Sequence, residues 1–171
     1  MTTERLNLLK KISLNKTFIR FLLILTFISV VPGYAVTVNL SAANARLMLI
    51  LAAEKYLGTP YVYGGIDSRG LDCSGLIYAS FKDSLNITVP RTADGLYSWT
   101  IRIPNEEMKP GDLVFFITSG PGISHVGIFA GDGYFIHAPS DGPNTGVIYS
   151  RLTESYWNRT FAGAGRAIPW E

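Results

Sequence analysis

Residues 71–81 have the sequence LDCSGLIYASF and contain Cys73, the only cysteine of the 171-residue chain. The apolar residues of this stretch recur at the spacing of one helical face, which predicts a helix from Cys73 to about Ser84. Asp72 stands where the N-cap of that helix would be. The stretch therefore predicts a thiol in the first turn of a helix, with an acid and a hydroxyl beside it.

A helix is also predicted before this stretch, and a β-sheet after it. Ser41 can cap the first helix, whose apolar residues cover more than one face, so we expect it to be well buried up to its stop at Gly58. An extended segment at residues 61–65 and a polar loop at 66–70 follow. Short apolar runs separated by glycine predict strands at residues 113–117, 124–130, 134–138, 147–149 and 161–168. Helices first and an antiparallel meander second predict an α+β domain.

The first 35 residues differ from the rest of the chain. They carry five basic residues and one acidic residue, followed by an apolar or hydroxylated run at residues 21–31. Eleven residues are too few for a transmembrane helix, which needs about 20, and small residues at Gly33 and Ala35 suit a signal peptidase. We therefore predict a signal peptide at residues 1–35 and a single domain at residues 36–171. An uncleaved membrane anchor is the alternative.

Whether the signal segment is cleaved or retained, the domain is predicted to be periplasmic or secreted. Contact with the membrane is expected only if the segment is retained. No cysteine stands near the predicted cleavage point, so a lipoprotein is not expected. Residues 36–171 hold 10 basic and 12 acidic residues, so the basic excess of the whole chain belongs to the signal segment. This charge balance does not predict a basic surface for binding nucleic acid.

Cys73 is open to three interpretations. Most free cysteines are small buried apolar residues. The second interpretation is a nucleophile, because the start of a helix lowers the pKa of a thiol. The two histidines of the chain, His125 and His137, flank a predicted hairpin turn at residues 131–133 and could serve such a nucleophile. His125 would then be the proton acceptor and His137 the residue that orients it. Zinc bound by these three residues with Asp72 or water is the third, but the close ligand pairs typical of zinc sites are missing.

Six short motifs follow one another in order along residues 45–168. They are GTPYVYGG (58–65), DCSGL (72–76), PRT (90–92), PGDLVFF (110–116), SHVGI (124–128) and FIHA (135–138). In this order they resemble the motifs of the NlpC-type cell-wall peptidases, which are papain-like cysteine endopeptidases that cut the peptides of peptidoglycan. The resemblance implies amino-terminal helices packed on an antiparallel sheet, with the nucleophile at a helix amino terminus.

The resemblance also implies roles for single residues. Cys73 would be the nucleophile, His125 the base and His137 the third, orienting residue, while the hydroxyl of Tyr61 would help to hold the oxyanion. Asp72 and Ser74 resemble positions that line the pocket for the stem peptide; Asp72 is equally explained as an N-cap, and Tyr61 as a core aromatic. Arg91 is expected to fix a loop or to bind a substrate carboxylate.

The expected activity is a thiol protease, that is, a hydrolase that opens amide bonds of murein stem peptides or cross-links through a thioester. It needs no cofactor and no metal, and its partners are peptidoglycan stem peptides. Two alternatives remain at this point. One is a catalytically silent wall-binding module, and the other is an amidase or acyltransferase that uses the same three residues.

Overall fold

The computed structural model describes residues 41–141 and 145–168. The predicted signal peptide at residues 1–35 and its cleavage point lie outside the described residues. Within the described ranges, no helix is long and apolar enough to cross a membrane.

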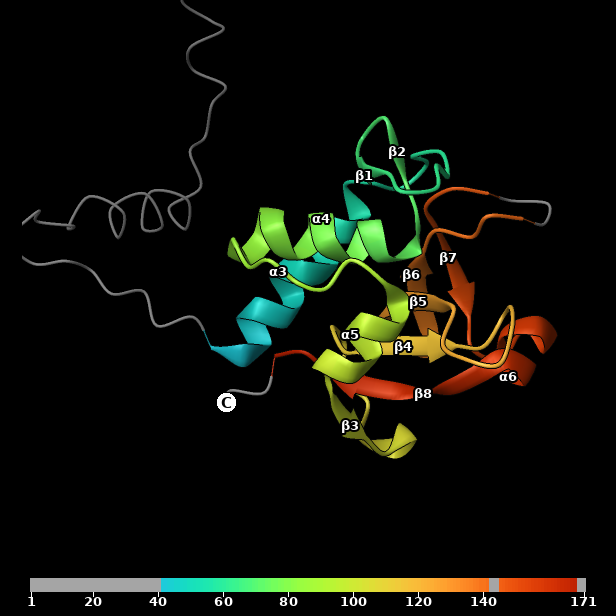
Figure 1. The fold of residues 1–171 in the computed structure, drawn as a ribbon. Coiled ribbons are helices and arrows are strands. Elements are labelled where there is room, and N and C mark those ends of the chain that lie inside the picture. Colours follow the sequence, from blue (N-terminus) through green and yellow to red (C-terminus); the bar gives the residue numbers. More distant parts are fainter. Residues whose placement is uncertain (1–40, 142–144, 169–171) are drawn as a thin grey trace, which may run out of the picture. The chain divides into compact units, whose positions relative to one another are not determined.

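The domain has two layers, with helices packed on a six-stranded antiparallel sheet (Figure 1). The prediction of an α+β fold is therefore confirmed. The helices are α3 (Ala42–Glu54), α4 (Cys73–Leu85), α5 (Ala93–Trp99), the 3₁₀ helix η1 (Asn105–Glu107) and α6 (Ser155–Thr160). The strands are β1 (Ile66–Asp67), β2 (Gly70–Leu71), β3 (Ile101–Ile103), β4 (Leu113–Phe116), β5 (His125–Gly131), β6 (Tyr134–His137), β7 (Ile148–Arg151) and β8 (Phe161–Arg166).

The large sheet has the strand order β3-β8-β4-β5-β6-β7. Strands β4 to β7 are sequential neighbours, as a meander predicts, whereas β8 returns to pair with β4 on the other side. The β5–β6 turn has Asp132 at φ 51° and Gly133 at φ 77°. Positive φ at both central residues suits the twist of a tight hairpin, so the predicted turn is present.

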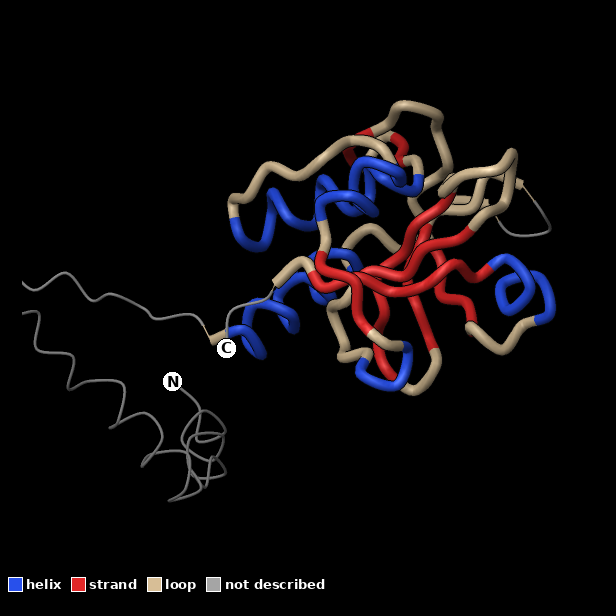
Figure 2. Tube along the Cα trace, turned by 60° about the horizontal axis from the view of Figure 1, so that its bottom comes forward, coloured by secondary structure: helices blue, strands red, loops and turns tan. Residues whose placement is uncertain are grey.

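Alternate residues of the sheet face two separate apolar cores. Phe115 of β4 packs in the core beneath α3 and α4, together with Leu76 and Ile77 of α4. Phe116, the next residue, lies in a second cluster with Phe135 and Trp157. This alternation is the period of two expected of a strand. Figure 2 shows the long helices on one side of the strands and the short helix α6 at the opposite end.

Helix α4 forms where the sequence predicts it. The Asp72 carboxylate accepts a hydrogen bond from the Gly75 N–H and thereby caps the first turn. Asn86 adopts a left-handed conformation with φ 54° and ends the helix. Local signals at both ends thus fix α4, and Cys73 is its first residue.

The structure corrects four expectations and adds elements that were not predicted. Helix α3 ends at Glu54, one turn before Gly58, and it is not fully buried, because Leu47 and Leu51 are about half exposed. Residues 66–70 are not a plain loop, since β1 and β2 form a small antiparallel hairpin there. Helix α5 and strand β3 were not predicted, and β8 does not extend the meander.

Candidate active site

Cys73 lies where two adjoining cavities meet. One cavity of about 500 Å³ is lined by Asp72, Ser74 and Arg91, and a second of about 250 Å³ is lined by His125 and Trp157. Both cavities are also lined by Cys73 and by three further residues that they share, Tyr61, Tyr63 and Ser124. The sulfur is therefore at the middle of a continuous groove and is partly exposed to it.

Arg91 holds the start of α4 through the Asp72 carboxylate. Its two terminal nitrogens donate to the two carboxylate oxygens at 2.7 and 2.8 Å, which is a bidentate pair. Arg91 also donates to the Ser74 hydroxyl at 2.7 Å, and Ser74 donates to Asp72 at 3.1 Å. Burial raises the pKa of Asp72, but the hydrogen bonds from Arg91, Gly75 and Gly64 and the charge of Arg91 together outweigh it, so the pKa is lowered. The three residues act as one brace beside the nucleophile.

The same brace fixes the loop that carries Tyr61. The Gly64 N–H donates to Asp72 at 2.8 Å, and Arg91 donates to the Gly65 carbonyl at 3.0 Å. A Cβ atom on Gly75 would come within 2.0 Å of that carbonyl, so only glycine lets the helix start approach the loop. The backbone of Gly64 and Gly65 therefore lies against the start of α4.

The two imidazoles form a hydrogen-bonded pair. His125 Nε2 and His137 Nδ1 are 2.9 Å apart, and the ring planes are nearly perpendicular. His137 lies directly opposite Gly127, two residues beyond His125 on the same face of β5. A Cβ on Gly127 would meet the Phe135 ring at 2.7 Å and the His137 Cβ at 3.2 Å. The missing side chain leaves room for the His137 ring to reach His125.

Two residues not assigned to the site from the sequence complete this pair. Ser150 Oγ lies 3.0 Å from His137 Nε2 on the far side of the ring. The Trp157 indole stacks on His125 at 5.2 Å and meets His137 edge-on at 4.5 Å, measured between ring centroids. Neither residue carries a local sequence signal that would assign it to the site.

The electrostatics of Cys73 differ from the expectation for a helix start. Burial, and next the negative charge of Asp72, raise the pKa of the Cys73 thiol, while hydrogen bonds from the Val126 and Ser74 N–H groups lower it only in part. The prediction of a lowered thiol pKa is therefore wrong, because desolvation exceeds the effect of the helix dipole. Near neutral pH the thiol is protonated.

The histidines are neutral as well. Burial lowers the pKa of His125 to about 4, and burial together with the nearby His125 charge lowers the pKa of His137. Tyr61 keeps its proton, because burial and the nearby Cys73 and Asp72 charges raise the pKa of its hydroxyl. The resting site thus offers an uncharged base and a hydrogen-bond donor around the sulfur.

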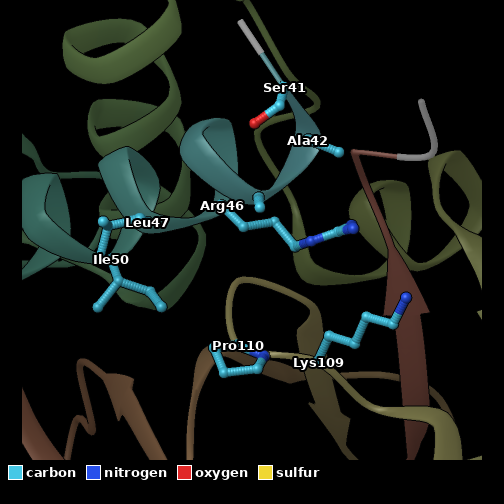
Figure 3. Close-up of a pocket in the computed structure, with 8 residues that line it drawn as sticks. Ser41, Ala42, Arg46, Leu47, Ile50, Lys109 and Pro110 are labelled. Carbon is cyan, nitrogen blue, oxygen red and sulfur yellow. The ribbon is translucent and has the colours of Figure 1, made fainter. Parts of the chain in front are cut away.

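Six of the seven residues predicted for the site line this groove: Tyr61, Asp72, Cys73, Ser74, Arg91 and His125. The seventh, His137, is fully buried behind His125. In the described part of the chain, no group of three or more His, Cys, Asp or Glu side chains is arranged to hold a metal ion. A separate cavity of about 540 Å³ lies between α3 and the Lys109-Pro110 turn, with Arg46 extending across it (Figure 3). None of the predicted site residues lines that cavity.

A thiol at a helix start beside paired imidazoles on an antiparallel sheet defines the class of papain-like cysteine peptidase domains. Residues 58–166 match the NlpC/P60 family, and the chain belongs to that family. The resemblance noted in the sequence is thereby confirmed.

Known relatives support the same assignment. The chain is 44% identical over 116 residues to the murein DD-endopeptidase MepH of Escherichia coli K12, covering 66% of this chain and 42% of that protein. It is 41% identical over 126 residues to the gamma-DL-glutamyl hydrolase of Bacillus subtilis 168, covering 72% and 30%. The chain thus spans less than half the length of these two relatives. The crystal structure of the NlpC/p60 domain of the peptidoglycan hydrolase SagA superposes with a TM-score of 0.61 at 30% identity, covering 71% of this chain and 97% of that domain.

Proposed function

We propose that this protein hydrolyses amide bonds in the peptides of peptidoglycan, with Cys73 as nucleophile. The observation that carries the proposal is the meeting of Cys73 and His125 in one cavity, with His125 hydrogen-bonded to His137 through Nε2. That bond leaves His125 Nδ1 as the ring nitrogen that can exchange a proton with the thiol. The names of the relatives, an endopeptidase of murein and a peptidoglycan hydrolase, support the substrate class.

The attack begins from an uncharged pair. His125 Nδ1 removes the proton from Cys73 as the sulfur bonds to the amide carbon, and the carbonyl π electrons move onto oxygen. Proton transfer and attack are coupled here, because burial disfavours both the free thiolate and the free imidazolium. The site therefore protects its thiol from reaction until a carbonyl is in place.

The oxyanion lies between two donors in this mechanism. Cys73 is the first residue of α4, and a helix leaves its first N–H groups without intrahelical acceptors. The Tyr61 hydroxyl, protonated at working pH, is the second donor. Donors fixed in advance where charge develops stabilise the transition state most effectively.

The intermediate then collapses toward products. The C–N bond breaks as His125 gives its proton to the leaving amine, which leaves a thioester on Cys73. His125 next activates a water molecule, whose oxygen replaces sulfur on the carbonyl carbon. The products are a carboxylic acid, an amine and the original thiol, so that one water is consumed for each bond cut.

The position of His125 at one end of the groove implies how the substrate lies in it. Because His125 protonates the leaving amine, the amine side of the substrate occupies the cavity shared with Trp157. The acyl side then occupies the cavity lined by Asp72, Ser74 and Arg91. Asp72 is only 10% exposed in its side chain, whereas Arg91 is 33% exposed, so Arg91 is the member of the brace most open to substrate.

The decisive experiment uses the full chain and isolated peptidoglycan. Released muropeptides are analysed by mass for the wild type, Cys73→Ala and His125→Ala, with Ser84→Ala on the same helix as a control. We expect new fragments from the wild type and the control only. Activity that persists in Cys73→Ala would exclude the nucleophile, and a folded wild type that releases nothing would favour the silent wall-binding module. Fragment masses also identify the bond, which relatives named for two different linkages leave open.

Export is part of the proposal. The basic and apolar pattern of residues 1–35 supports a signal peptide and a periplasmic or secreted domain. Amino-terminal sequencing of protein recovered from the producing cells tests this. A chain that starts at Val36 indicates cleavage, and an intact amino terminus in the membrane fraction indicates an anchor.

A further inference from the structure

Ser150 ends a row of hydrogen-bonding groups that begins at the proposed nucleophile. His137 is fully buried, and Ser150 is 7% exposed. In the β6–β7 ladder His137 lies opposite Ile148, so Ser150 is its diagonal neighbour on the same face. The serine hydroxyl is thereby held 3.0 Å from His137 Nε2 by strand register.

The resting site allows two directions for this row of hydrogen bonds. In the first, His125 Nε2–H donates to His137 Nδ1, and His137 Nε2–H donates to Ser150. In the second, every hydrogen bond is reversed and His125 carries its proton on Nδ1. Only the first leaves His125 Nδ1 free to accept the proton of Cys73. A hydroxyl can serve either direction, since it both donates and accepts.

The charged state allows one direction only. When His125 has taken the proton from Cys73, both of its ring nitrogens donate, so His137 Nδ1 must accept. Neutral His137 then carries its proton on Nε2, which points at Ser150. Without an acceptor there, a buried N–H would lose its hydrogen bond at the moment when positive charge develops on His125.

We propose that Ser150 is a positioning residue for catalysis, which accepts the Nε2–H hydrogen bond of His137 and so stabilises the imidazolium that forms on His125. This role rests on the proposed function, because the imidazolium forms during attack by Cys73. Ser150 touches neither substrate nor sulfur and acts only through His137. Its contribution is larger in the transition state than in the resting state, so it affects turnover more than binding.

The test compares Ser150→Thr with Ser150→Val in the full-length protein. The two side chains have the same shape and differ in one hydroxyl, so packing changes are common to both. We expect Ser150→Thr to keep most of the activity and Ser150→Val to lose about ten-fold in kcat with KM little changed, which corresponds to one hydrogen bond. Ser150→Ala should resemble Ser150→Val.

A matched control is Ser80→Ala. Ser80 is fully buried on α4, and its hydroxyl has no hydrogen-bond partner among the described residues. Loss of a buried serine hydroxyl as such should therefore leave the rate unchanged. Circular dichroism confirms that each variant is folded. Equal rates for Ser150→Thr and Ser150→Val, together with an unaffected Ser150→Ala, would overturn the proposal.

A second readout does not depend on peptidase activity. The imidazole N–H groups are followed by NMR on protein with ¹⁵N-labelled histidine and no substrate. We expect a slowly exchanging His137 Nε2–H signal in the wild type and in Ser150→Thr, and its loss or upfield shift in Ser150→Val. A wild type with His137 protonated on Nδ1 would refute the assigned direction. If the wild type cleaves no peptidoglycan, the proposed function fails, while the NMR comparison still decides whether Ser150 accepts the Nε2–H hydrogen bond of His137.

Discussion

The guanidinium of Arg91 and the carboxylate of Asp72 meet in a two-point contact, 19 residues apart in sequence, with distances of 2.7 and 2.8 Å. Because the same carboxylate caps α4, this pair connects the loop after α4 to the helix start that presents Cys73. A planar fork is required for such a contact, which a lysine cannot reproduce.

We therefore expect Arg91→Lys to destabilise the protein by about 2 kcal/mol, since a largely buried carboxylate loses one of its partners. The catalytic rate should fall as well, because the Tyr61 loop is held by the same guanidinium. Thermal unfolding and muropeptide release measure the two effects. Arg69→Lys is the control, because Arg69 pairs with Asp67 at the surface and its side chain is 89% exposed. An Arg91→Lys protein as stable as the Arg69→Lys protein would contradict this prediction.

The buried histidines predict a specific loss of stability in acid. Burial lowers the pKa of His125 to about 4, below the ordinary histidine value of 6.5, and it lowers the pKa of His137 also. At pH values between 4 and 6.5, the histidines bind protons in the unfolded chain but not in the folded chain. The free energy of unfolding therefore falls as the pH falls from 6.5 toward 4. His125 alone contributes roughly 3 kcal/mol to this loss.

Urea unfolding at a series of pH values measures this slope. The His137→Gln protein should show a shallower dependence over the same window, because one of the two groups no longer titrates. A wild-type stability that is constant from pH 6.5 to pH 4 would show that the histidines are hydrated in solution.

The raised pKa of Cys73 predicts slow alkylation at neutral pH. The reaction with iodoacetamide requires thiolate, so its rate should increase with pH and reach its midpoint above that of an ordinary cysteine. A peptide of residues 71–81 provides the same cysteine without the fold. Intact-mass measurement of labelling should show the peptide reacting faster near neutral pH. Faster labelling of the folded protein would instead indicate a preformed thiolate.

The Trp157 indole covers both imidazoles, and its removal should expose them. We expect Trp157→Leu to cost about 3 kcal/mol of stability. The variant should also raise the pKa of His125 from about 4 toward 6.5, since water would reach the ring. NMR titration of the histidine ring protons measures this shift. Trp99→Leu is the control, because Trp99 packs on Phe81 and is 41% exposed. A His125 titration that is identical in both variants would refute the shielding role.

Gly127→Ala should separate the two imidazoles. The new methyl group would lie within 2.7 Å of the Phe135 ring and 3.2 Å of the His137 Cβ. Overpacking of this kind costs about 2 kcal/mol, and the displaced His137 ring should lower kcat by more than ten-fold. Gly122→Ala is a neutral comparison, because nothing lies within 4 Å of a Cβ at that position. Retained activity in Gly127→Ala would show that the hydrogen bond between the histidines is dispensable.

The parts of the fold that the sequence predicts are those with local signals. Helix α4 has a capping acid, a helical period and a left-handed stop within 15 residues, and the β5–β6 hairpin has its turn at Asp132. The return of β8 to pair with β4 has no such signal, because it depends on contacts between distant segments. Short elements such as α5 are likewise fixed by tertiary packing more than by propensity.

The candidate site divides in the same way. Cys73, His125 and His137 were found from residue type and position beside a helix start and a turn. Ser150 was missed because its contact with His137 depends on the register between β6 and β7, which are joined by a ten-residue connection. The sign of the Cys73 pKa shift was missed because the helix start is visible in the sequence, whereas the depth of burial is not.

The absence of a side chain at Gly127 makes the candidate site depend on the register between β5 and β6. The imidazoles pair only if Gly127 lies opposite His137, and a slip of one residue would place Val126 or Ile128 there instead. Cys73 reaches them from a helix 52 residues away from His125 in the sequence. Before its strands have aligned, the chain therefore holds the thiol and the two histidines apart from one another. The candidate site is therefore assembled only by folding, because neither the pairing of the imidazoles nor their approach to Cys73 exists in the unaligned chain.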